Sequence, residues 1–276
     1  MKTYLENYKH FGNCLFIENG DVKLAVPLSF GIRIVYLSYK GSENLFFEQP
    51  SEMKDLSTDW GWRVFGGHRL WIAPESKDNY AVETNPISYE IVDDKVILTQ
   101  PFDSWLKVYK KIEISFEKDN VVKLLHVITN GDDKVRKFSP WAVSSMSGGG
   151  TEFIPLFYRD GGYDPLHRIS MWDYTSLGDE RVEYTRELIT LRHKPTSKKY
   201  KIGVGHPNGN VKYVNKGVVF EKEYELSNSE YPDGNVSFET FMCDYMVEVE
   251  SLAPLTEVKP NESAYHIEKW ILNKDN

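Results

Sequence analysis

The sequence predicts an all-β protein whose short strands form a sandwich or a barrel. The main observation is that apolar and polar residues alternate with a period of two in segments spread along the whole chain. Turn residues separate these segments at regular intervals, and apolar residues at helical spacing are scarce. Many short strands divided by turns are typical of sandwiches and barrels.

The period-two segments place the strands in order along the chain. Phe30-Gly31 interrupts the first of them, and the glycine is expected to bend or bulge the strand there. Only 55–63 and 171–177 have a pattern that can hold a helical turn or two. The expected strands are 22–28, 32–37, 87–92, 95–99, 107–116, 121–129, 187–193, 199–205, 211–214, 218–224, 236–241, 245–252 and 263–272.

Short polar turns between neighbouring strands predict β-hairpins. Asp, Asn and Gly favour the backbone conformations that tight hairpin turns require. We also expect 187–193 to pair with 199–205 across the intervening Lys and Pro residues. The tight turns are expected at 93–94, 118–120 and 215–217.

Composition points to one globular domain over residues 1–276. The 276 residues are 41% hydrophobic and 14% aromatic, which is ample for a core, and no segment has the composition of a linker. Two cysteines, Cys14 and Cys243, lack CxxC spacing and are expected to be buried free thiols in a reducing compartment.

Charge and hydropathy exclude several classes of partner. A formal net charge of −8 and a pI near 5.5 argue against nucleic acid and anionic membranes as partners. Neither a signal peptide nor an apolar stretch of membrane-spanning length is recognisable. The expected location is therefore the cytoplasm, and the sequence gives no indication of the oligomeric state.

No motif predicts a metal or a cofactor. The seven histidines show neither HxH nor HExxH spacing, and no phosphate-binding Gly-rich loop is present. The segment 144–150, Ser-Ser-Met-Ser-Gly-Gly-Gly, lacks the GxSxG pattern of a nucleophile elbow and is interpreted as a strand that runs into a turn.

The segment 65–75 has the strongest concentration of functional side chains. Gly66 and Gly67 allow the close approach of backbone or ligand. An indole offers a flat apolar face to a sugar, and charged groups bind hydroxyls. The alternative is a glycine turn followed by a core tryptophan and surface charges. The candidates in this segment are His68, Arg69, Trp71 and Glu75.

A second group of candidates lies on the strands near the C-terminus. Strand alternation in 245–252 places Glu248 and Glu250 on the face opposite the valines, toward solvent or toward a cleft. In a cleft, one acid could act as a general base whose pKa the other raises. Glu239 on the preceding strand is a further candidate. His266, on the next strand, is interpreted as structural.

The loop 159–168 and the residue Trp172 complete the candidate set. Loops over a β scaffold commonly carry binding residues, and this one contains His167. An ordinary surface loop is the alternative.

Together these segments resemble the galactose mutarotase-like family, which includes the aldose 1-epimerases. The resemblance covers most of the chain and implies a β-supersandwich of large antiparallel sheets with a concave sugar-binding face. The matching segments are 31–34 (Gly-Ile-Arg-Ile), 66–71 (Gly-Gly-His-Arg-Leu-Trp), 127–130 leading into 139–143, and 249–255 followed by 259–263.

The resemblance also implies roles for particular residues. Glu250 looks like the general base of the epimerases, with Glu248 the less favoured match, and Arg69 looks like their sugar-contacting arginine. The chain departs from the family at Trp141, which stands where the epimerases have a catalytic histidine. His68 is then the candidate for the missing proton donor.

We therefore expect a protein that binds a sugar or a small oligosaccharide, with no cofactor. It could be an aldose 1-epimerase-like enzyme, a non-catalytic sugar-binding or sensing protein, or a carbohydrate-cleaving enzyme that uses a carboxylate pair. The candidate catalytic residues are Glu250, His68 and Glu248. The candidate substrate-binding residues are Arg69, Trp71, Glu75, Trp141, Glu239, His167 and Trp172.

Overall fold

The computed structural model describes residues 1–83, 85–163, 165–205 and 207–275, and it is almost entirely β. Within these residues there are 22 strands, two 3-10 turns at Lys9–Phe11 and Lys77–Tyr80, and one short helix, α1 (Pro232–Asn235). The predicted all-β class is confirmed.

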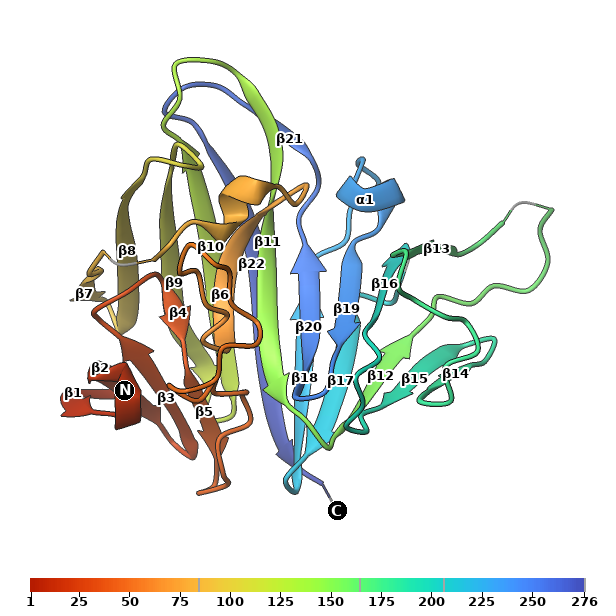
Figure 1. The fold of residues 1–276 in the computed structure, drawn as a ribbon, viewed down its shortest axis with the longest axis horizontal. Coiled ribbons are helices and arrows are strands. Elements are labelled where there is room, and N and C mark those ends of the chain that lie inside the picture. The colour runs from red at the N-terminus through yellow and green to blue at the C-terminus, as the bar shows by residue number, and fades with distance from the viewer. Residues whose placement is uncertain (84, 164, 206, 276) are drawn as a thin grey trace.

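A four-stranded antiparallel sheet lies at the N-terminal end of the molecule, in the order β1-β2-β3-β5 (Figure 1). The strands β1 and β2 were not predicted. Because β2 is buried on both faces, it has a continuous apolar run instead of an alternation. The strands are β1 (Lys2–Asn7), β2 (Asn13–Asn19), β3 (Val22–Pro27) and β5 (Tyr36–Tyr39).

A ten-stranded antiparallel sheet spans the molecule in the order β14-β15-β12-β17-β18-β22-β10-β9-β8-β7. The hairpin predicted at 93–94 is confirmed, and both turn residues have the positive φ that a tight hairpin turn demands. Its strands are β7 (Ser88–Val92), β8 (Lys95–Asp103), β9 (Val108–Lys118), β10 (Val121–Asn130), β12 (Thr151–Pro155), β14 (Val182–Tyr184), β15 (Leu188–Arg192), β17 (Asn210–Asn215), β18 (Val218–Tyr224) and β22 (Ser263–Lys274).

An eight-stranded sheet carries most of the predicted site residues. Its main path runs β13-β16-β19-β20-β11-β6-β4, and β21 pairs with β11 beside this path. Its strands are β4 (Arg33–Ile34), β6 (Gly67–Ala73), β11 (Arg136–Ser147), β13 (Arg168–Met171), β16 (Tyr200–Gly205), β19 (Phe238–Met242), β20 (Met246–Leu252) and β21 (Thr256–Val258).

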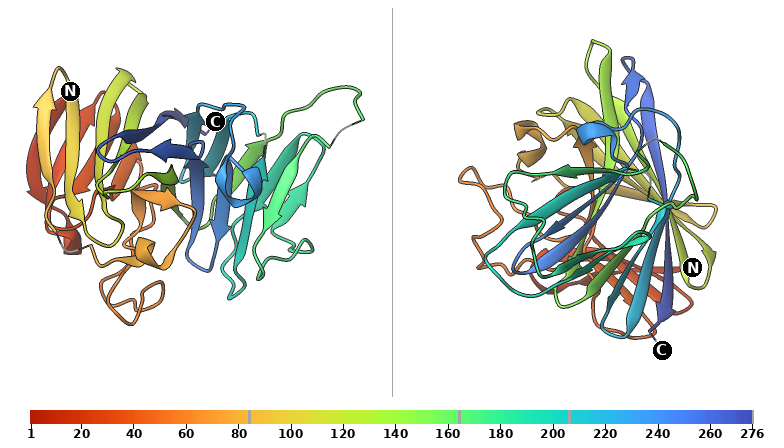
Figure 2. Two further views of the ribbon diagram at one scale, coloured as in Figure 1. Left: turned by 90° about the horizontal axis from the view of Figure 1, so that it is seen from above. Right: turned by 90° about the vertical axis from the view of Figure 1, so that its right-hand side faces the viewer.

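The eight-stranded and ten-stranded sheets pack face to face, and the main core lies between them. Side-chain hydrogen bonds cross from one sheet to the other, for example from Thr240 on β19 to Glu152 on β12. Figure 1 and the left-hand view in Figure 2 show the four-stranded sheet at one end and β14 with β15 at the other. The site is thus carried on the outer face of a sheet whose inner face is fixed by the core.

Two local predictions were wrong. The segments 187–193 and 199–205 do not form a hairpin, because β15 pairs with β12 and β14 while β16 pairs with β13 and β19. The chain between them crosses from one sheet to the other, which alternation within each strand cannot indicate. The segments 55–63 and 171–177 contain turns, bridges and a strand end in place of helical turns.

Cys14 and Cys243 are buried free cysteines, as expected. Among the described residues, the helices are too short and too polar to span a bilayer.

Candidate functional site

A cleft of about 460 Å³ lies on the outer face of the eight-stranded sheet. The floor comes from β6, β11, β16, β19 and β20, and two segments, 56–64 and 172–174, contribute its walls. The lining is rich in aromatic rings and also contains charged groups of both signs. The lining residues are Leu56, Ser57, Thr58, Trp62, Val64, Arg69, Trp71, Glu75, Tyr80, Trp141, Trp172, Tyr174, Lys199, Lys201, Phe241, Met246 and Glu248.

The glycine pair at the start of β6 allows this strand to pass close to its neighbours. Gly66 and Gly67 have φ values of 88° and 72°, in the left-handed region that favours glycine. A Cβ atom on Gly66 would lie 1.9 Å from the Phe47 carbonyl oxygen, and one on Gly67 would lie 2.2 Å from the Ile34 carbonyl oxygen. The pair is therefore needed for packing, and it sets the direction in which β6 enters the sheet.

Strand alternation along β6 directs Arg69 and Trp71 into the cleft. The Arg69 guanidinium lies over the Trp71 indole, 4.4 Å from the ring centroid. It donates hydrogen bonds to Glu248 Oε1 at 3.0 Å and to Ser145 Oγ at 3.1 Å, and the Ser145 hydroxyl donates to the same Glu248 oxygen at 2.7 Å. This network fixes a cation and a carboxylate side by side in the cleft.

Lys201 on β16 forms a second charged group at the floor. Its ammonium lies 2.8 Å from Glu239 Oε2 and 3.4 Å from Glu250 Oε2. The same nitrogen is 4.6 Å from the centroids of both Trp141 and Trp172. The two glutamates lie directly opposite each other on β19 and β20, so that one ammonium serves both carboxyl groups.

Burial and charge shift the pKa values of these groups in opposite directions. The pKa of Glu250 is raised to about 7, mainly by burial, with Lys201 opposing the shift and Glu248 adding to it. Burial also raises the pKa of Glu239 well above its usual value. For Lys201, burial lowers the pKa, but the two carboxylates outweigh it and the net shift is upward. The Lys201 side chain is therefore an ammonium at neutral pH.

Six of the predicted residues line the cleft: Arg69, Trp71, Glu75, Trp141, Trp172 and Glu248. Trp71 and Trp141 are only 4% and 2% exposed and pack edge to face at 5.4 Å, so they form the floor and do not present a free face for stacking. Trp172 is partly exposed, and Tyr174 is 43% exposed. Together with the partly buried Tyr80 and Phe241, these two rings form the accessible aromatic surface of the cleft.

Glu250 and Glu239 lie beneath the cleft, behind Lys201, and both are fully buried. The sequence predicted that the acidic face of β20 looks into solvent or a cleft. Only Glu248 reaches the cleft, whereas Glu250 contacts Lys201.

His68, predicted to be a catalytic residue, does not line the cleft. His68 alternates with Arg69 along β6, so its ring points to the opposite face, between the two large sheets, where it is fully buried. Its Nε2 lies 2.8 Å from His126 Nε2, and its Nδ1 lies 2.9 Å from Ser144 Oγ. His68 cannot be the proton donor of this cleft.

His167 is also placed elsewhere. It lines a separate depression with Leu156, Ile169 and Tyr184 and does not line the cleft.

Lys201 is the main residue that sequence reasoning missed. The signal was its position in an otherwise apolar and glycine-containing strand, Tyr200–Gly205, where a charged side chain needs a partner. The partners lie on β19 and β20, and the wrong hairpin prediction concealed that pairing.

Three potential metal ligands, His68, His126 and Glu268, meet between the sheets with their ligand atoms within 4.8 Å of one another. The Lys222 ammonium already lies 2.7 Å from Glu268 Oε1 and supplies the positive charge at this point. Burial lowers the pKa of both His68 and His126, so these imidazoles are neutral and bond to each other. The contact between His68 on β6 and His126 on β10 joins the two sheets at this point.

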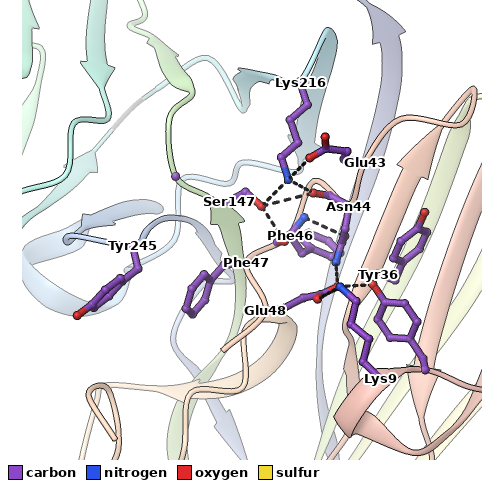
Figure 3. A pocket seen from close by; sticks show the side chains of 12 residues that line it. Lys9, Tyr36, Glu43, Asn44, Phe46, Phe47, Glu48, Ser147, Lys216 and Tyr245 are labelled. Atoms are coloured by element: carbon purple, nitrogen blue, oxygen red, sulfur yellow. Dashed lines mark hydrogen bonds and ion pairs between the residues drawn. The ribbon is translucent and has the colours of Figure 1, made fainter. Parts of the chain in front are cut away.

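A second depression, of about 480 Å³, lies beside the N-terminal sheet (Figure 3). Its charged side chains have partners within the depression. Lys9 pairs with Glu48, and Lys216 donates to Ser147 Oγ at 3.1 Å and to the Asn44 carbonyl oxygen at 2.5 Å. We therefore place the candidate site in the cleft of the eight-stranded sheet.

No protein-family model matches the sequence, and neither does any curated protein. Solved structures do match the fold. A TPR-domain-containing protein from Parabacteroides distasonis matches with a TM-score of 0.67 and 12% identity, over 96% of this chain and 47% of its own. The chain thus spans about half the length of that protein.

Two further solved structures align over nearly their full length. A candidate mutarotase from Salmonella typhimurium has a TM-score of 0.60 and 10% identity, over 95% of this chain and 91% of its own. A galactose mutarotase-like protein from Lactobacillus casei has a TM-score of 0.58 and 11% identity, over 94% of this chain and 100% of its own. At these identities the likeness concerns the fold alone.

Proposed function

We propose that this chain, which has the fold of the galactose mutarotase-like proteins, binds an aldose or a short oligosaccharide in the cleft of its eight-stranded sheet. The observation that carries the proposal is that accessible aromatic rings, Trp172 and Tyr174, line the same cleft as the Arg69–Glu248 pair. The names of the similar structures, among them mutarotases, support the same ligand class.

The chemistry of a sugar suits this arrangement. The C–H faces of a pyranose are apolar and pack on aromatic rings, as other apolar groups do. Its hydroxyls both donate and accept hydrogen bonds, and charged partners form the stronger ones. Arg69 and Glu248 supply a donor and an acceptor at fixed positions, because each is held by the other and by Ser145.

A second candidate function is the interconversion of sugar anomers. The observation that favours it is that a carboxylate, Glu248, and an ammonium, Lys201, both line the cleft, so a base and an acid are present at one site. Glu250, the base expected from the family resemblance, has a pKa of about 7, which suits proton transfer near neutral pH. Because Glu250 lies beneath the floor, it would act through Lys201 and not on the sugar itself.

The test is saturation-transfer NMR of the purified protein with D-glucose, D-galactose, D-mannose, D-xylose and maltose, with anomer exchange recorded in the same samples. We expect binding, and we expect Trp172→Ala to weaken it about tenfold, since a partly exposed stacking ring contributes on the order of 1 kcal/mol. Trp105→Ala is the matched control, because Trp105 is 44% exposed and lies outside the cleft. Trp71 is less suitable because its removal would disturb the core.

The outcomes separate the candidate functions. Binding with accelerated exchange that is lost in Glu248→Gln or Glu250→Gln supports the epimerase activity. Binding with exchange at the buffer rate supports a sugar-binding or sensing protein. Absence of binding to every sugar in the panel overturns the proposal.

A further inference from the structure

We infer that Lys201 is the hydrogen-bond donor at the floor of the cleft that contacts the bound sugar, and that Glu239 and Glu250 position its ammonium. This inference rests on the proposed sugar-binding function. The fold comparisons do not point to this lysine, and its assignment comes from the geometry of the cleft.

The Lys201 ammonium is held in place by the groups packed around it. Lys201 Nζ lies over the indole rings of Trp141 and Trp172, 4.6 Å from the centroid of each, and its side chain is only 7% exposed. The segment that carries Trp172 is held against β16 by the Thr175 hydroxyl, which donates to the Lys201 carbonyl oxygen at 2.6 Å and accepts from the Lys201 N–H at 2.9 Å. A lysine fixed in this way has lost most of its rotamer freedom before any ligand arrives.

The Lys201 ammonium has fewer hydrogen-bond acceptors around it than it has donors. An ammonium has three N–H donors. One is donated to Glu250 Oε2 at 3.4 Å, and Glu239 Oε2 lies 2.8 Å from the nitrogen as an ion-pair partner. Among the described residues no third acceptor is within hydrogen-bond distance of Nζ, although Lys201 lines the cleft. At least one N–H of the ammonium is thus available to an acceptor oxygen of a ligand.

The burial of Lys201 with Glu239 and Glu250 costs stability. An ammonium and two carboxyl groups are withdrawn from water here, and burial of such groups is retained where geometry or function requires it. Glu250 Oε1 is buried and has no hydrogen-bond partner among the described residues. A fold that needed only a stable sheet would gain from apolar side chains at these positions, so a role toward a ligand accounts for the cluster.

Lys201 is also placed to act as a proton donor, a role that the Trp141 side chain cannot fill. If the bound aldose opens, the Lys201 ammonium gives a proton to the ring oxygen as the bond from that oxygen to the anomeric carbon breaks. Glu248 takes the proton of the anomeric hydroxyl, whose oxygen becomes the carbonyl oxygen. Closure on either face returns both protons, so the step is balanced and needs no further reactant.

The test uses three variants of the full chain. Lys201→Met removes the donor and keeps the length of the side chain. Because this change leaves two carboxyl groups without a cation, Lys201→Met combined with Glu239→Gln keeps the balance and protects against misfolding. Lys212→Met is the matched control, since Lys212 is a half-exposed strand lysine in an ion pair on the other sheet.

We expect both Lys201 variants to bind the sugars that bind the wild type at least tenfold more weakly, and the control to bind them unchanged. A direct measurement is the lysine ammonium region of a ¹H–¹⁵N NMR spectrum, where the signal missing in Lys201→Met should shift when the sugar is added to the wild type. A residue with only a structural role would not show this shift.

The results distinguish the two proposals. If the wild type binds a sugar while the Lys201 variants bind it equally well, or the ammonium signal stays unchanged, the inference is wrong and the proposed function stands. If the wild type binds none of the sugars, both are wrong.

Discussion

At the scale of single residues, the most unusual group outside the cleft is Glu152, a fully buried carboxyl between the two large sheets. Its Oε2 accepts a hydrogen bond from the Thr240 hydroxyl at 2.6 Å, and its Oε1 has no hydrogen-bond partner among the described residues. Burial raises its pKa from 4.5 to about 8, so that Glu152 is largely neutral at physiological pH. The core thus contains a carboxylic acid in place of a carboxylate.

This shift gives stability a definite pH dependence. Because the folded-state pKa of Glu152 is raised, its contribution to stability is complete below about pH 4.5 and is lost as the pH rises through about 8. We predict that Glu152→Gln, which cannot ionise, gains stability relative to the wild type over this range, by a few kcal/mol at about 1.4 kcal/mol per pKa unit. The measurement is urea unfolding of both proteins at pH 5, 7 and 9. A difference that stays constant with pH would contradict it.

At the scale of elements, β6 depends on the two glycines that precede its cleft-facing residues. Gly67 and Gly41 have the same φ of 72°, but only Gly67 is crowded. A Cβ on Gly67 would lie 2.2 Å from the Ile34 carbonyl oxygen, whereas a Cβ on Gly41 would meet nothing within 4 Å. Alanine at these two positions therefore distinguishes the cost of a left-handed backbone, present at both, from the cost of a steric clash, present only at Gly67.

We predict that Gly67→Ala lowers the free energy of unfolding by roughly 3 kcal/mol or more, because a backbone oxygen must move. Gly41→Ala should cost only about 1 kcal/mol, from the left-handed conformation alone. Thermal and urea unfolding of the two variants provide the measurement. Equal losses would show that the close approach at Gly67 relaxes without cost.

The sequence predicted most strands and part of the site, because both follow from alternation along a single strand. Arg69, Trp71 and Glu248 reach the cleft as this rule requires. The same rule, applied to β6, would have placed His68 opposite Arg69, on the inner face of the sheet. Strands buried on both faces, such as β2, have no alternation to detect.

Contacts between strands far apart in the sequence could not be predicted in this way. The Lys201 group joins β16, β19 and β20, and its recognition needs the strand order of the sheet. Which tryptophans remain accessible depends on packing among the rings, and residue type alone does not show it.

At the scale of the whole molecule, the two large sheets are joined by polar contacts inside the core. The Lys222 ammonium on β18 lies 2.7 Å from Glu268 Oε1 on β22 and donates to the carbonyl oxygens of Ala142 and Val249 on the facing sheet, at 3.2 Å and 2.9 Å. Glu268 also accepts from Ser251 on the facing sheet at 2.5 Å. These contacts fix how one sheet lies on the other.

We predict that Lys222→Met destabilises the fold by about 3–5 kcal/mol, because Glu268 is left as a buried charge without its cation. Lys222→Met combined with Glu268→Gln should recover part of this loss. Lys212→Met, which removes a half-exposed ion pair, should change stability by less than about 1 kcal/mol. Urea unfolding at pH 7 measures all three. If Lys222→Met with Glu268→Gln is no more stable than Lys222→Met alone, the unpaired Glu268 carboxylate is not the cause of the loss.

The position of β22 in the ten-stranded sheet has a consequence for synthesis on the ribosome. This strand, Ser263–Lys274, lies between β18 and β10 and is the only bridge between the two halves of the sheet within the described residues. Until residues 263–274 emerge, β10 and β18 each present an unpaired edge, and about 50 residues separate the end of β18 from the end of β22. At roughly 5–20 residues per second the edge of β18 stays open for several seconds and that of β10, which ends at Asn130, for longer. During this time the nascent chain is a target for strand-capturing chaperones or for aggregation.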